Sequence, residues 1–328
     1  MRQWILAMIL AATAAGCTAA VPRDRITLAV LGGVYLGVPS DAKVEGAMVE
    51  DAESLLRKAV ADLNARKDLD FVIVSGDLLA RADGANLDRS RAILAELRAP
   101  YVMVLGLTDG PAPSGGGLSR SDVTWAFQGH GFQGPEGYWS REILPGLVLV
   151  GLDTVQPGRR EGRVDARQLE WLEQTLTAAE GKSVLVAMYH QATPMHPLDE
   201  GAAWKFKMID NAAAVRQALD RHRNVLAVVS GAGHFSAGHV GGRIVYLAAP
   251  SVSVWPLAYQ LIRMTPKEVE AVWVPVADDD LSRRAQDRLL ASPLWRGVFP
   301  TGEDGDSACV RLFGGKKLEV YALPAIRP

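Results

Sequence analysis

Short apolar runs alternate with segments of helical periodicity along most of this chain. The apolar runs predict strands at Ile26–Leu31, Phe71–Ser75, Tyr101–Leu105, Leu147–Leu152, Ser183–Met188, Val225–Ser230, Arg243–Ala248 and Val269–Val274. The periodic segments predict helices at Val44–Arg66, Arg89–Arg98, Asp165–Ala179, Ala212–His222 and Asp279–Leu290. This alternation predicts an α/β domain in which one sheet, or two facing sheets, lies between helices.

One predicted helix also shows which of its faces is buried. Leu169, Leu172 and Leu176 recur at three and four residues, which is the spacing of a stripe that faces a core. Trp171 lies beside this stripe, and Asp165 is placed to cap the helix. We therefore interpret these residues as scaffold.

The first residues have the pattern of an export signal. Arg2 precedes an apolar stretch from Ile5 to Ala15, and small residues lead directly into Cys17. This pattern resembles a bacterial lipoprotein signal, which implies cleavage after residue 16 and a lipid on the Cys17 thiol. Ordinary cleavage near Ala19 or Ala20 is an alternative, and an uncleaved helix is a third, although the apolar run is short for a membrane span. The first two interpretations predict an exported protein, and lipidation predicts one anchored to a membrane and facing the periplasm or the cell surface.

Composition narrows the class of protein. The 328 residues are 48% hydrophobic and 22% charged, as in globular proteins, and 35 basic against 37 acidic side chains leave a net charge of −2. This balance gives no electrostatic reason to expect nucleic acid as a partner. Two cysteines, Cys17 and Cys309, are too few for a disulfide framework or a cysteine-rich zinc site.

The residues that follow the predicted strands are the candidates for chemistry, because sites in α/β folds form at the carboxyl ends of strands. These segments are Gly33-Val34-Tyr35, Gly76-Asp77, Gly106-Leu107-Thr108-Asp109, Tyr189-His190 and Gly231-Ala232-Gly233-His234. The flanking blocks are Val72-Ile73-Val74-Ser75, Gly151-Leu152-Asp153-Thr154, Gln168-Leu169-Glu170-Trp171-Leu172 and Val228-Val229-Ser230. In this order and spacing, the series resembles the calcineurin-like metallophosphoesterases, within them the cyclic-nucleotide and glycerophosphodiester phosphodiesterase branch.

The resemblance extends from about Ile26 to Ala249 and implies an α/β/β/α sandwich, in which helices flank two facing sheets. It divides the chain into a signal peptide at 1–16, a phosphoesterase domain at 24–277 and a helical extension at 278–328. The family holds two divalent cations with Asp-x-His, Gly-Asp, Gly-Asn-His, His and Gly-His-x-His segments at successive strand ends.

Most of those ligand positions carry other residues in this chain. Asp77 and His234 match two of the family's seven ligands. The other five positions are occupied by Gly33, Tyr35, Leu107, Tyr189 and Ala232, and His190 aligns one place too late. Thr108 replaces the histidine to which the family's general-acid role is assigned. Because loss of even one outer-shell partner costs roughly 10–100-fold in metal affinity or activity, we expect no dinuclear site and no cofactor. If the chain is active, the resemblance implies manganese, iron or zinc.

Two hypotheses of function follow. The leading one is a catalytically degenerate member of the fold that binds or assembles with another envelope protein or a phosphorylated ligand. In it Asp77 caps local amide groups or pairs with His234, and Tyr35 and Tyr189 fill the space of the missing metals. The alternative is a metal-dependent phosphoester hydrolase with a reduced or relocated site, whose candidate catalytic residues are Asp77, Asp109, His190 and His234.

Overall fold

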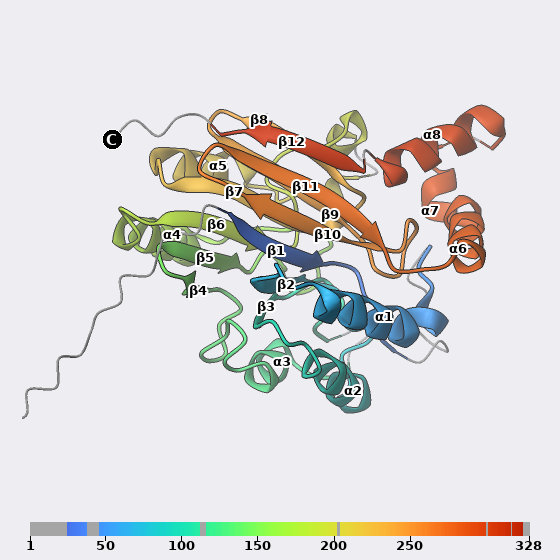
Figure 1. Ribbon diagram of the computed structural model, residues 1–328, viewed down its shortest axis with the longest axis horizontal. Helices are drawn as coiled ribbons and strands as arrows, with labels where there is room; N and C mark the ends of the chain where they lie inside the picture. Colours follow the sequence, from blue (N-terminus) through green and yellow to red (C-terminus); the bar gives the residue numbers. More distant parts are fainter. Residues whose placement is uncertain are drawn as a thin grey trace, which may run out of the picture.

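The computed structural model describes residues 25–37, 46–111, 116–201, 204–299, 301–315 and 317–323. The predicted signal peptide and the predicted lipidation site Cys17 lie outside these residues. Two six-stranded sheets face each other and carry helices on their outer sides (Figure 1). The predicted α/β/β/α sandwich is therefore confirmed.

The first sheet has the strand order β12-β11-β10-β1-β2-β3. Its strands are β1 (Ile26–Leu31), β2 (Phe71–Ser75), β3 (Tyr101–Val104), β10 (Ala258–Met264), β11 (Glu268–Pro275) and β12 (Leu318–Ala322). Strands β1, β2 and β3 are parallel, whereas β10, β11 and β12 join antiparallel. The carboxyl ends of β1, β2 and β3 therefore meet at one edge of the sheet.

The second sheet has the order β4-β5-β6-β7-β9-β8. Its strands are β4 (Trp139–Leu144), β5 (Leu147–Leu152), β6 (Ser183–Met188), β7 (Val225–His234), β8 (Ala237–Gly241) and β9 (Ile244–Pro250). Strands β5, β6, β7 and β9 are parallel, and the edge strands β4 and β8 are antiparallel to their neighbours.

Alternation along the strands divides the core into two apolar layers. Leu149 of β5 packs between the sheets with residues of β1 and β2, whereas Val148 and Val150 face the opposite side and pack with Leu172 and Leu176. Successive side chains of a strand point to opposite faces, so one buried strand serves both layers.

The helices are α1 (Ala52–Ala65), α2 (Gly84–Leu94), α3 (Arg120–Ala126), α4 (Ala166–Ala178), α5 (Ala212–Arg221), α6 (Asp279–Ala291), α7 (Pro293–Arg296) and α8 (Glu303–Gly314), with 3-10 turns η1 (Val49–Asp51), η2 (Pro197–Glu200) and η3 (Lys205–Lys207).

Helix α4 forms as its sequence predicts. The Asp165 side chain accepts a hydrogen bond from the backbone amide of Gln168 at 2.8 Å and so caps the helix. Leu172 and Leu176 are completely buried. Trp171, by contrast, is only partly buried, and its ring packs against Tyr138 with a centroid separation of 4.7 Å.

Two helix predictions were wrong in their boundaries. The described part of the segment Val44–Arg66 contains a 3-10 turn before α1 begins at Ala52. Helix α2 begins at Gly84, five residues before the predicted Arg89, because the Asp83 side chain caps it by accepting from the amide of Asn86. It ends at Leu94 rather than at Arg98.

Four strands were not predicted: β4, β8, β10 and β12. Strand β4 reads Trp-Ser-Arg-Glu-Ile-Leu and β12 reads Leu-Glu-Val-Tyr-Ala, so both mix charged and apolar residues. Strands β4, β8 and β12 lie at sheet edges, where one face or edge meets water, and therefore lack the long apolar run that marks a central strand. Strand β10 is central, between β11 and β1, but Gln260 and Arg263 interrupt its apolar run.

The predicted helical extension at 278–328 is helical through α6, α7 and α8, but it ends in β12, which pairs with β11. The predicted extension therefore contributes a strand to the first sheet. Arg288 of α6 binds Glu50 and the carbonyl of Ala47. Helices α6, α7 and α8 gather at the end of the molecule toward which β1 points (Figure 1). None of the helices in the described part of the chain has the length and apolar character required to cross a bilayer.

Candidate functional site

The loops after β1 and β2 and the last residue of β7 lie at the carboxyl edge of the two sheets in an unusual backbone conformation. Tyr35, Asp77 and His234 have φ angles of 53°, 53° and 60°. This left-handed region costs a non-glycine residue about 1–2 kcal/mol. The amides of Val34 and Tyr35 both donate to the carbonyl of Asp77 at 2.9 Å, so hydrogen bonds between the loops after β1 and β2 fix the strained conformations of Tyr35 and Asp77.

The Asp77 carboxylate lies at the centre of this region and is 1% exposed. Its Oδ2 atom accepts hydrogen bonds from the hydroxyl groups of Tyr35 at 2.6 Å and Tyr189 at 2.5 Å. Its Oδ1 atom accepts from the amide and the hydroxyl of Thr108, both at 3.0 Å. Four donors from three loops therefore hold one buried carboxylate. The prediction that Asp77 caps a local amide is confirmed, and the phenol donors replace the predicted direct pairing with His234.

His234 reaches Asp77 through Tyr35. Its Nε2 atom lies 3.0 Å from the Tyr35 hydroxyl, and the two rings meet edge to face. The single Tyr35 proton is donated to Asp77, so the hydroxyl oxygen accepts a hydrogen bond from the Nε2–H group of His234. Burial, with a smaller effect of the nearby Lys207, lowers the pKa of His234 to about 3. His234 is therefore neutral at pH 7, and its Nε2 atom has no lone pair free for a metal.

The two tyrosines are held in their protonated form. Burial, followed by the charge of Asp77, raises the pKa of Tyr35 and of Tyr189 well above the ordinary value. A protonated phenol is a hydrogen-bond donor and a poor metal ligand. Both side chains consequently stabilise the anionic Asp77 instead of competing with it.

Asp109 lies beside this cluster but binds backbone. Its Oδ1 atom accepts from the amide of Leu79 at 2.9 Å and its Oδ2 atom from the amide of Gly106 at 2.8 Å. Burial, followed by the charge of Asp77, raises the pKa of Asp109 to about 7. This residue fixes the loop after β3 and presents no oxygen to the space between Asp77 and His234.

The structure does not bring His190 into the cluster. Its Nδ1 atom lies 2.8 Å from the Thr154 hydroxyl and its Nε2 atom 2.9 Å from the carbonyl of Arg160. Burial lowers the pKa of His190 to about 4. Both ring nitrogens are thus used to fix the loop after β5, and His190 turns away from Asp77.

At the family's ligand positions that carry other residues in this chain, neighbouring side chains fill the space that a metal ion would need. Ala232, Tyr189 and Val155 form a small buried cluster against which Leu107 packs. At Gly33 a Cβ atom would lie 2.6 Å from Oγ of Ser251, and the Ser251 hydroxyl donates to the Gly33 carbonyl at 2.6 Å. A carboxylate at residue 33 would therefore displace Ser251.

These residues do not fit a pair of divalent cations. Such a site needs several carboxylates and neutral imidazoles with free lone pairs. Within the described residues, no group of three or more histidine, cysteine, aspartate or glutamate side chains is placed to hold a metal ion. Both oxygens of Asp77 and the Nε2 atom of His234 already have partners.

Sequence reasoning missed Lys207, a buried residue that contacts the backbone next to His234. Its ammonium group donates to the Gly233 carbonyl at 2.7 Å and is 4.2 Å from the ring centroid of Trp204 and 4.6 Å from that of Trp295. The side chain is 1% exposed, and burial lowers the pKa of Lys207 to about 7. Trp295 belongs to α7, so one buried lysine joins the C-terminal helices to the residue that precedes His234. No local pattern marks a lysine for burial.

Comparison with known proteins agrees with this fold. No protein-family model matches the chain. A probable cyclic nucleotide phosphodiesterase of Synechococcus sp. is 26% identical over 185 residues, which are 56% of this chain and 66% of the relative. A cAMP/cGMP dual specificity phosphodiesterase of Mycobacterium tuberculosis is 26% identical over 230 residues, which are 66% of this chain and 64% of the relative. The chain thus spans just under two thirds of the length of these curated relatives.

Solved structures show the same architecture. A dimetal phosphatase from Danio rerio superposes with a TM-score of 0.60 at 16% identity, covering 77% of this chain and 97% of that one. GAP50, described as the anchor in the inner membrane complex of Plasmodium, superposes with a TM-score of 0.51 at 10% identity, covering 83% and 96%. In its two-sheet fold, its strand-end motifs and its phosphodiesterase relatives, the chain is similar to the calcineurin-like metallophosphoesterases.

Proposed function

We propose that this chain is a non-catalytic member of the metallophosphoesterase fold that binds and assembles with another protein of the cell envelope. The proposal includes export and attachment to the membrane through a lipid on Cys17, because the sequence before Cys17 resembles a lipoprotein signal. The fold neighbour GAP50, described as the anchor in the inner membrane complex of Plasmodium, is consistent with a member of this fold that acts as an anchor.

The state of Asp77 is the observation that carries the proposal. In a dinuclear site the bridging carboxylate offers its oxygens to cations. Here both oxygens accept hydrogen bonds from Tyr35, Tyr189 and Thr108. The phenols remain protonated up to high pH, so a cation would have to displace two buried hydrogen-bond donors from Asp77. No second carboxylate is placed to help bind that cation, among the residues that the structure describes. The same anionic centre disfavours a phosphate ligand, which favours a protein partner over a phosphorylated one.

Metal analysis combined with a phosphodiester assay tests this proposal. The full chain, purified from membranes in detergent and incubated with manganese, zinc or iron, is desalted and examined by elemental analysis. Hydrolysis of bis(p-nitrophenyl) phosphate and of cyclic AMP is measured on the same samples. We expect no stoichiometric metal and no turnover above that of Asp77→Ala, which serves as the matched control. About two metals per chain, or turnover lost in the control, would contradict the proposal.

The phosphodiesterase relatives favour a second candidate, a metal-dependent phosphoester hydrolase with a reduced or relocated site. Asp77 and His234 are the family positions it would use, because Asp109 and His190 are committed to backbone and loop contacts. This candidate predicts hydrolysis that chelation abolishes and that both Asp77→Ala and His234→Ala remove. Chelator-sensitive activity that survives both substitutions would place the site elsewhere in the chain.

A further inference from the structure

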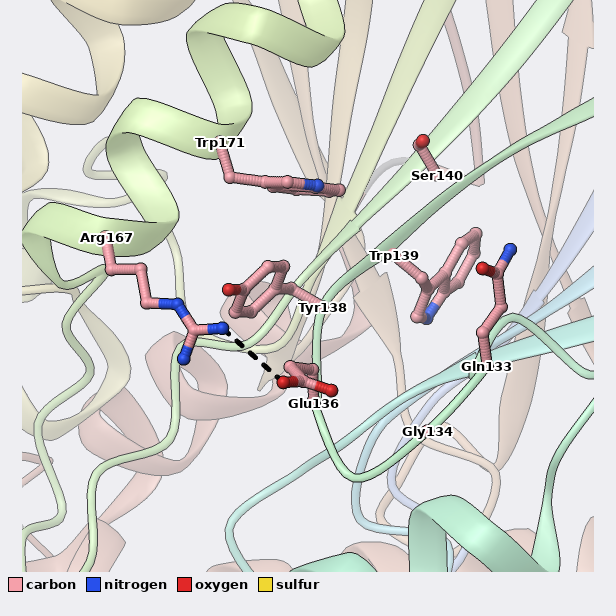
Figure 2. Close-up of a pocket in the computed structure, with 8 residues that line it drawn as sticks. All are labelled: Gln133, Gly134, Glu136, Tyr138, Trp139, Ser140, Arg167 and Trp171. Atoms are coloured by element: carbon pink, nitrogen blue, oxygen red, sulfur yellow. Dashed lines mark ion pairs between the residues drawn. The ribbon is translucent and has the colours of Figure 1, made fainter.

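A groove of about 360 Å³ lies between the start of β4 and the first half of α4. Helix α4 contributes Arg167 and Trp171, and the chain around the start of β4 contributes Gln133, Glu136 and Tyr138 (Figure 2). None of these five side chains takes part in the Asp77 cluster. The volume lies in the range of small-ligand sites, at its lower end.

Two aromatic rings form one side of the groove. The rings of Tyr138 and Trp171 are 4.7 Å apart at 53° to each other, and both residues are only partly buried. Figure 2 shows the Trp171 indole extending over the Tyr138 ring. An aromatic ring presents a negative face that attracts the polarised C–H groups of a ligand. The pair therefore offers a flat apolar platform beside solvent.

The opposite wall is rigid. Trp139 is 3% exposed, and its indole N–H donates to the carbonyl of Met103 at 2.9 Å. A Cβ atom at Gly131 or Gly151 would lie 2.4 or 2.3 Å from the Trp139 ring, so backbone on two sides clamps the indole. The groove is therefore shaped before a ligand arrives, which lowers the entropy cost of binding.

The polar groups of the groove balance in charge. Among the described residues that line it, the charged ones are Glu136 and Arg167, which form an ion pair at 3.5 Å across one end (Figure 2). The Arg167 side chain is 77% exposed, so its remaining N–H groups can serve a ligand. Together with the Gln133 amide, these planar groups offer several donors and acceptors with no net charge.

This combination selects one ligand class. A phosphate or other anion would meet the Glu136 carboxylate, and an aliphatic chain would leave the polar groups without partners. A neutral sugar ring has an apolar C–H face for the platform and adjacent hydroxyls for the carboxylate, guanidinium and amide. We propose that this groove is a binding site for a neutral saccharide, independent of the function proposed for the fold as a whole.

Glycan binding by the full chain tests the inference. The detergent-solubilised protein is applied to an array of neutral and anionic oligosaccharides, and any hit is measured by titration calorimetry. We expect a neutral oligosaccharide to bind, and Trp171→Ala or Tyr138→Ala to weaken that binding roughly tenfold or more. Trp125→Ala is the matched control, because Trp125 is 52% exposed on α3 and does not line the groove.

Arg167→Ala distinguishes loss of binding from misfolding, because this exposed side chain can be removed without disturbing the core. It should weaken saccharide binding while leaving the thermal unfolding midpoint unchanged. Failure of every neutral glycan on the array, binding restricted to anionic glycans, or equal affinity in the Trp171→Ala and Trp125→Ala variants would each overturn the inference.

Discussion

Removing the phenol hydroxyls around Asp77 is the most direct test of the site. In Tyr189→Phe the ring remains, so no cavity forms, but Oδ2 of Asp77 loses a donor at 2.5 Å. A hydrogen bond to a charged group contributes about 1.5–3 kcal/mol. Because Tyr35 still donates to the same oxygen, we expect Tyr189→Phe to lower the free energy of unfolding by about 2 kcal/mol.

The companion substitution should cost more. Tyr35→Phe removes a donor to Asp77 at 2.6 Å and also the partner of His234 at 3.0 Å. We expect a loss of about 3 kcal/mol, since a second buried polar atom then lacks its partner. The double variant leaves Oδ2 with neither phenol donor. Its loss should exceed the sum of the single losses by about 1 kcal/mol, the coupling expected of groups in one buried network.

Urea unfolding at pH 7, followed by tryptophan fluorescence, measures these free energies. The matched control is Tyr138→Phe, a partly exposed tyrosine outside the cluster, whose effect should lie within about 0.5 kcal/mol. Equal slopes against urea are required, so that a shift of the midpoint reports stability. Single losses no larger than the control, or strictly additive ones, would refute the account of Asp77 as an anion held by two phenols.

Three further predictions address other parts of the chain. Cys17→Ser should release the protein from the membrane fraction or block its processing; a wild-type protein that is soluble and free of lipid by mass spectrometry would contradict lipidation. Leu172→Ala should cost about 2–5 kcal/mol, because the side chain is completely buried; an unchanged melting curve would contradict the packing of α4. Burial lowers the pKa of Lys207 to about 7 from 10.5, so between pH 7 and 10 the unfolded chain binds a proton that the native protein has released, and native stability should rise with pH. The stability of wild type relative to Lys207→Met should therefore increase by up to about 4 kcal/mol over that interval. The stability of wild type relative to the exposed Lys205→Met should stay nearly constant, because both proteins keep Lys207. A constant difference for Lys207→Met would refute the burial of its charge.

The sequence alone determined the parallel strands and the residues at their ends. Runs such as Phe71–Ser75 are apolar because both faces of the strand are buried, and this is visible locally. Local pattern also predicted the capping of α4 by Asp165, whereas the resemblance to a known family marked Asp77 and His234 as the remaining ligand positions. Edge strands such as β12 were not predicted, because a strand that is half exposed has no continuous apolar run in its sequence.

Only the tertiary structure decided what the strand-end residues do. Tyr35 and Tyr189 are 154 residues apart in sequence, yet both hydroxyls meet one oxygen of Asp77. His190 adjoins Tyr189 in the chain but points into another loop, because neighbouring residues at a strand end face opposite directions. Lys207 is buried between the ring of Trp204, three residues away, and the ring of Trp295, which lies far along the chain in α7. Periodicity is a property of neighbours along the chain, whereas hydrogen-bond partners and burial depend on which segments converge in space.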